Sequence, residues 1–143
     1  MAPKRTPLYE LCLDEGSRFI PFADWEMPVQ FAGLIEEHQA VRKNVGLFDI
    51  SHMGVLRLEG NNPKKALQGL VPSDLNRIGP GEACYTVLLN KEGGIIDDLI
   101  IYDLGINDKN QEALLIVINA ANSYDDINWL HTSLIPENIH ISD

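Results

Sequence analysis

Residues 83–102 read ACYTVLLNKEGGIIDDLIIY, and their pattern organises the second half of the chain. The two ends of the stretch, 83–89 and 95–102, are rich in β-branched, aromatic and other apolar residues, which is typical of strands. Between them, Asn90 to Gly94 supplies residues that favour turns. The stretch therefore predicts an antiparallel β-hairpin.

The second strand of this hairpin carries two adjacent acids, Asp97 and Asp98, in an otherwise apolar run. Side chains alternate along a strand, so Asp98 shares a face with Ile100 and Tyr102, while Asp97 lies on the other face. Burying an ionised carboxylate without a partner is costly, so we expect one acid to be paired or at a rim. The other would face a cavity that raises its pKa and suits proton transfer. Alternatively, either acid simply accepts hydrogen bonds from a neighbouring loop.

The remaining patterns predict an α+β fold with antiparallel sheets and flanking helices. From residue 54 the expected order is β-α-β-β-β-α-β, close to a ferredoxin-like layer of sheet against helices. The further elements expected there are strands over 54–60, 113–118 and 139–141, and helices beginning at Pro63 and after Asn122. The first half predicts a short helix capped by Thr6, a strand over 18–22, a helix over 33–44 and a strand over 46–51.

The composition of the chain favours a soluble globular protein over a membrane protein, a secreted protein or a metalloprotein. The chain has 143 residues, 45% of them hydrophobic and 22% charged, as in a soluble globular protein with a real core. We expect no membrane contact and no signal peptide, because no apolar run approaches the ~18 residues of a membrane span and no apolar segment follows the basic N-terminal residues. The cysteines and histidines lack ligand-like spacing, so we expect free thiols and no metal site.

The charge is strongly acidic and unevenly placed. A net charge of −10 argues against nucleic acid as a partner, since phosphate binding needs clustered Lys and Arg. Residues 97–143 hold nine acids and one base, so this part contributes −8 of the total. Apart from Asp97 and Asp98, we expect most of these acids to form a solvated surface.

Several segments together resemble the aminomethyltransferase family, the T-protein of the glycine cleavage system. Each is a weak signal alone, but the ordered set along almost the whole chain is specific. Two positions depart from the family pattern: Asp24 replaces a glycine, which tolerates unusual backbone angles, and Cys12 replaces a histidine. The matching segments are TPLY (6–9), FADWEMP (22–28), EHQAVR (37–42), VGLFDISHMG (45–54), YT (85–86), GGIIDDLI (93–100) and NAAN (119–122), with Asp126 and Trp129.

The resemblance implies a tetrahydrofolate-dependent transferase. Family members take the aminomethyl group carried on the lipoyl arm of the H-protein, release ammonia and pass the one-carbon unit to the co-substrate tetrahydrofolate. It also implies a bacterial cytoplasmic location or, alternatively, a mitochondrial one. Two other functions stay open: a related folate-dependent demethylase with a different one-carbon donor, and a non-catalytic folate-binding module.

The resemblance also implies roles for individual residues. Asp98 matches the family's catalytic carboxylate, which would orient the pterin and exchange a proton at nitrogen while the methylene is captured. Asp97 would then be structural. An apolar and aromatic wall with a few polar anchors suits a pterin ring. The positions that match the family's folate cavity are Met53, Tyr85, Ile100, Tyr102 and Asn119.

Family members are much longer than this chain and wrap three domains round a central folate channel. The resemblance therefore implies an incomplete version of the folate-binding T-protein fold, in a truncated fragment. Residues 1–52 would begin a first, discontinuous domain, and residues 53–143 would form most of a second. We expect a missing C-terminal complement to be a further partner.

Overall fold

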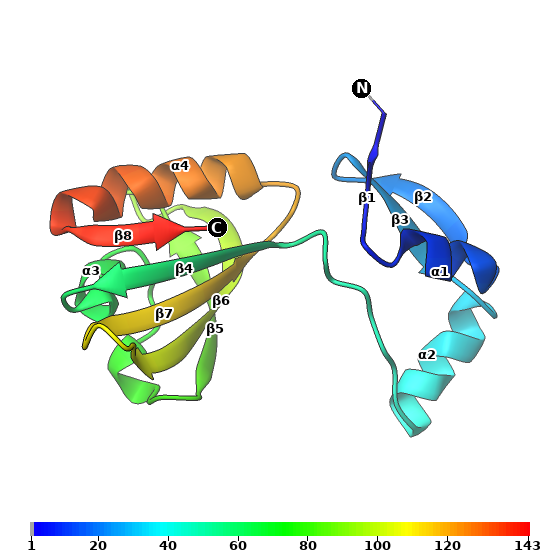
Figure 1. Ribbon diagram of the computed structural model, residues 1–143, viewed down its shortest axis with the longest axis horizontal. Helices are drawn as coiled ribbons and strands as arrows, with labels where there is room; N and C mark the ends of the chain where they lie inside the picture. Colours follow the sequence, from blue (N-terminus) through cyan, green and yellow to red (C-terminus); the bar gives the residue numbers. More distant parts are fainter. Residues whose placement is uncertain (1) are drawn as a thin grey trace. The chain divides into compact units, whose positions relative to one another are not determined.

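The structure, a computed structural model, describes residues 2–143. Contacts divide the chain into two compact units, Met1–His52 and Met53–Asp143. Helices and strands occur in both units (Figure 1), as the predicted α+β class requires.

The first unit contains a three-stranded sheet in the order β1-β3-β2. Its strands are β1 (Lys4–Arg5), β2 (Arg18–Phe22) and β3 (Trp25–Gln30), of which β2 and β3 form an antiparallel hairpin. The turn of this hairpin places Asp24 at a φ of 65°, in the left-handed region. Glycine adopts that conformation freely and aspartate tolerates it, which explains how Asp24 can stand where the family pattern has glycine.

Two expectations for the first unit are wrong. Helix α1 (Tyr9–Asp14) has Leu8 as its N-cap, and Thr6 takes part through its backbone oxygen, which accepts a hydrogen bond from Tyr9 N–H. Helix α2 (Leu34–Lys43) forms as expected, but the segment after it, 45–50, has no regular secondary structure. Leu47 in that segment is 99% exposed, and none of the described strands of the unit pairs with it.

The second unit follows the predicted order of elements, with two additional 3-10 turns. Its five strands form one antiparallel sheet in the order β5-β6-β7-β4-β8 (Figure 1). Strands β7 and β8 therefore run parallel on either side of β4, and α4 connects them in a split βαβ arrangement. The elements are β4 (Gly54–Gly60), α3 (Pro63–Gln68), η1 (Leu75–Arg77), β5 (Ala83–Leu89), β6 (Ile95–Ile106), β7 (Glu112–Ile118), α4 (Ser123–Leu134), η2 (Ile135–Glu137) and β8 (Ile139–Ser142).

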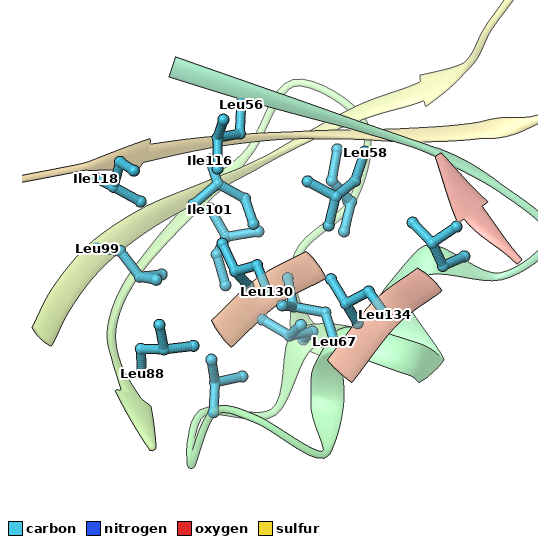
Figure 2. Packing of buried hydrophobic residues seen from close by; sticks show 14 residues of the cluster. Leu56, Leu58, Leu67, Leu88, Leu99, Ile101, Ile116, Ile118, Leu130 and Leu134 are labelled. Atoms are coloured by element: carbon cyan, nitrogen blue, oxygen red, sulfur yellow. The ribbon is translucent and has the colours of Figure 1, made fainter. Parts of the chain in front are cut away.

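The core of this unit lies between one face of the sheet and the helices α3 and α4 (Figure 2). Leucine and isoleucine side chains fill it, and burying each contributes roughly 1.5–3 kcal/mol relative to leaving it exposed. The side chains that expose 2% of their surface or less include Leu56, Leu58, Leu67, Leu88, Leu99, Ile101, Ile116, Ile118, Leu130 and Leu134.

The hairpin of β5 and β6 forms as predicted, with Val87 opposite Asp98 and Tyr85 opposite Ile100. In its turn, Gly93 has a φ of 82°, a conformation that favours glycine. Strand β6 continues past Tyr102 to Ile106, beyond the predicted end.

The expected solvated acidic surface does not extend to Asp103, which is buried. Strand alternation puts Asp103 on the same face as Leu99 and Ile101, so it points into the core. There its Oδ2 lies 2.6 Å from Lys64 Nζ, and its Oδ1 accepts a hydrogen bond from Gly105 N–H. The buried charge is therefore paired, as burial requires.

No helix within residues 2–143 is long and apolar enough to cross a bilayer. In the same part of the chain, no group of three or more His, Cys, Asp or Glu side chains is arranged to hold a metal ion. Cys12 and Cys84 are both free thiols.

Candidate functional site

Strand β6 presents its two central acids to opposite faces of the sheet. Asp97 lies on the helix-covered face and is 8% exposed, whereas Asp98 is half-buried on the opposite face. The predicted alternation is therefore correct. The sequence pattern did not decide which acid is buried, because both faces of the strand are mostly apolar.

Asp97 and Asn119 hold the backbone of Asp98. Asp97 Oδ1 accepts hydrogen bonds from the Asp98 N–H at 2.9 Å and from Asn119 Nδ2 at 3.0 Å. Asn119 Nδ2 also donates to the backbone oxygen of Asp98 at 3.0 Å. Both polar groups of the Asp98 main chain are thus bound, so the direction of its side chain is well defined. Asn119 follows the last residue of β7, which places it beside β6.

The carboxylate of Asp98 accepts a hydrogen bond from the hydroxyl of Tyr85, with 2.9 Å between Oη and Oδ2. Tyr85 lies on β5 diagonally across from Asp98, within reach of a long side chain. This hydrogen bond, followed by the negative charge of Asp98, raises the pKa of Tyr85. Tyr85 therefore stays a neutral donor at physiological pH.

The residues predicted to line a folate cavity do not all lie on the same face of the sheet as Asp98. Ile100 and Tyr102 share its face of β6, and Tyr85 joins them from β5. Tyr85 is 68% exposed, so this face is open to solvent. Asn119 contacts Asp97 and the Asp98 backbone through its amide nitrogen. Met53 is half-buried and immediately precedes β4.

The expectation that the acids of residues 97–143 form a solvated surface is wrong for Asp126. Its side chain, on α4, is fully buried. Burial, the hydrogen bond that a protonated Asp126 can give Asp97, and the negative charges of Asp97, Asp125 and Asp98 raise the pKa of Asp126 to about 7. Asp126 is spaced four and eight residues before the core residues Leu130 and Leu134. This helical spacing was the signal in the sequence that could have identified it as buried.

The arrangement suits binding more than covalent chemistry. Asp98 accepts hydrogen bonds, Tyr85 both donates and accepts them, and Ile100 and Tyr102 add apolar and aromatic surface beside them. Such a face can orient a flat ring that carries N–H groups.

Comparison with known proteins identifies close relatives of this chain. The family model described as the GCVT N-terminal domain matches residues 8–143. An aminomethyltransferase of Prochlorococcus marinus (strain MIT 9313) is 67% identical over 140 residues, which cover 98% of this chain and 37% of the relative. The aminomethyltransferase of Parasynechococcus marenigrum (strain WH8102) is 64% identical over 143 residues, covering 100% of this chain and 39% of the relative.

A solved structure is also similar. The crystal structure of the glycine cleavage system aminomethyltransferase T from Bartonella henselae matches with a TM-score of 0.85 and 34% sequence identity. The match covers 96% of this chain and 37% of that one. The chain thus spans well under half of the length of the proteins that it matches.

Proposed function

Because this chain belongs to the family of the GCVT N-terminal domain, we propose that it serves in tetrahydrofolate-dependent aminomethyl transfer in the glycine cleavage system. The methylene of the aminomethyl group on the lipoyl arm of the H-protein would pass to tetrahydrofolate, with release of ammonia. The observation that carries the proposal is the carboxylate of Asp98, which accepts a hydrogen bond from Tyr85 on an open sheet face. The side chains of Asp97 and Asn119 hold the main chain of Asp98 in place beneath it.

We assign the reacting end of the folate to this face. Asp98 orients the pterin through its N–H groups and exchanges a proton at nitrogen during capture of the methylene. Tyr85, Ile100 and Tyr102 form the wall beside it. Their common face, on adjacent strands, supports this assignment.

Met53 and Asn119 complete the proposed folate set. The amide nitrogen of Asn119 is engaged with the β6 backbone, so its amide oxygen is the atom assigned to the folate. Asp97 takes the structural role, which its hydrogen bond to the Asp98 N–H supports.

The partners of this activity are proposals as well. The lipoylated H-protein would supply the aminomethyl group, and the portion of the relatives that this chain does not span would complete the folate site. We assign residues 1–52 to the start of a discontinuous domain and residues 53–143 to most of a second. Exposed apolar side chains of the first unit, among them Ile35, Leu47 and Phe48, support a further segment that packs there. The cyanobacterial relatives support a bacterial cytoplasmic setting.

The test combines binding with turnover. Tetrahydrofolate binding is measured by calorimetry for this chain alone and with the C-terminal remainder of the Prochlorococcus relative added in trans. Asp98→Asn is compared with Asp108→Asn, which makes the same charge change at an exposed turn. With the remainder present, we expect Asp98→Asn to lose turnover with lipoylated H-protein and Asp108→Asn to keep it. Turnover with methylated amines but not with H-protein would favour a demethylase. Folate binding without any turnover, with the remainder present, would favour a non-catalytic module.

A further inference from the structure

Three carboxylate oxygens beneath β6 lack a hydrogen-bond donor. They are Oδ2 of Asp97 and both side-chain oxygens of Asp126, and no donor within residues 2–143 reaches them. Asp97 is 8% exposed and Asp126 is 0% exposed, so bulk water does not solvate them. Buried polar atoms are almost always hydrogen-bonded, so three unpartnered oxygens in one place require an explanation.

The charges around this pair are all negative. Asp97 faces Asp126 from β6, and Asp125 lies beside it on α4. The charge of Asp98, on the other face of the sheet, also acts on Asp126. Asn119, from the end of β7, donates to the other oxygen of Asp97 and carries no charge. Two ionised carboxylates in contact and out of water would repel one another strongly, and no cation of the described chain balances them here.

A single proton resolves both problems. If Asp126 is protonated, its hydroxyl becomes the donor that Asp97 Oδ2 lacks, and one of the two buried charges disappears. Pairs of carboxyl groups that share a site commonly bind one proton between them.

We propose that Asp97 and Asp126 share one proton and together form a positioning pair for Asp98. The chain of hydrogen bonds runs from the Asp126 hydroxyl to Asp97 Oδ2, and from the Asp98 N–H to Asp97 Oδ1. Asp126 thus acts on the folate face from the opposite side of the sheet, without touching a ligand. Only this effect on folate rests on the proposed function, because the shared proton is a property of the folded unit.

The positioning pair has a consequence for pH dependence. Loss of the shared proton leaves two adjacent anions under β6, which pushes the Asp97 side chain away from Asp126. The hydrogen bond that holds the Asp98 N–H then weakens. Because the pKa of Asp126 lies at about 7, this change falls within the physiological range.

The test is an NMR titration of the whole chain with aspartate labelled by carbon-13 at the carboxyl group, from about pH 5 to about pH 9. We expect one carboxyl resonance to titrate near neutral pH and the Asp98 amide resonance to follow it. Asp126→Asn removes the proton but keeps a donor for Asp97, so both transitions should vanish and the Asp98 amide should stay in its low-pH position. Asp125→Asn, one residue away and exposed, should retain both transitions.

Titration of every aspartate below about pH 5 would overturn the shared proton. A neutral transition that the Asp98 amide does not follow would overturn the positioning role. If Asp126→Asn does not fold, Asp126→Glu replaces it, because glutamate keeps the acid. The neutral transition should then remain in Asp126→Glu and disappear in Asp97→Asn, which assigns the transition to the pair.

A second readout concerns tetrahydrofolate. Affinity of the natural chain should fall by up to roughly tenfold per pH unit above the transition, and Asp126→Asn should remove this slope. A slope that Asp126→Asn leaves unchanged would overturn the effect on folate. If no folate binds at any pH, the proposed function fails, while the carboxyl titration still decides whether the proton is shared.

Discussion

The main chain of Asp98 is fixed independently of its carboxylate. Its N–H and C=O are bound by Asp97 and Asn119, whereas its carboxylate meets Tyr85 on the open face. Side-chain changes at position 98 should therefore alter chemistry on the face and leave the strand in place. Changes at Asp97 or Asn119 should act in the opposite way, through the position of the strand.

The contact between Asp98 and Tyr85 can be measured through the tyrosine. Since the hydrogen bond and charge of Asp98 raise the pKa of Tyr85, Asp98→Asn should lower it toward the ordinary value of 10.0. An ultraviolet titration of tyrosinate would show the shift, and a Tyr85→Phe variant identifies which of the four tyrosines is responsible. Asp108→Asn should leave the titration unchanged. An equal shift in both aspartate variants would mean that general charge, and not the contact, sets the pKa.

At the scale of elements, the hairpin was predictable because β-branched composition and turn residues agree with the final pairing of β5 and β6. Alternation predicted that Asp97 and Asp98 lie on opposite faces, but it did not decide which face the helices cover. Burial of Asp126 was missed because acids in the first turn of a helix usually remain in solvent, whereas here packing of α4 onto the sheet decides. The strand expected over 46–51 failed because pairing partners are a tertiary property that a local pattern does not contain.

The packing of α3 against β6 depends on a buried ion pair. Lys64 Nζ pairs with Asp103 and also donates to the backbone oxygen of Ile78 at 2.7 Å. Lys64→Met should lower the free energy of unfolding by about 3–5 kcal/mol, because it leaves the buried Asp103 carboxylate without a counter-charge. Lys65→Met is a matched control at the next, exposed position and should change stability by less than about 0.5 kcal/mol. Urea denaturation measures both, and similar losses would show that the ion pair is not needed.

At the scale of the whole molecule, the two units differ in how much apolar surface they bury. The second unit has a continuous hydrophobic core, whereas the first exposes many apolar side chains. The second unit buries a continuous set of leucine and isoleucine side chains, so it has what an independently stable unit needs. The first unit has no buried residue in α2 and exposes 81% of Val45 and 99% of Leu47. Global stability measurements on the chain therefore report mainly on the second unit, where Asp97 and Asp126 lie.

The contribution of Asp126 to the stability of this unit should fall as the pH rises toward neutrality. Folding raises the pKa of Asp126 from 3.8 to about 7, so the folded state binds more protons than the unfolded state between these values. The contribution of Asp126 to the free energy of unfolding is fully present below about pH 4, decreases across this window and is lost through about pH 7. A rise in the pKa of Asp126 from 3.8 to about 7 corresponds to at most about 4 kcal/mol of stability.

Urea denaturation of the natural chain at a series of pH values between about 4 and about 8 measures this slope. Asp126→Asn should flatten it, because the amide has no proton to lose and still donates to Asp97. Asp125→Asn controls for the general effect of removing one negative charge from a chain of net charge −10. If Asp126→Asn keeps the pH dependence of the natural chain, then Asp126 is ionised in the folded state across this range and the buried pair carries two charges.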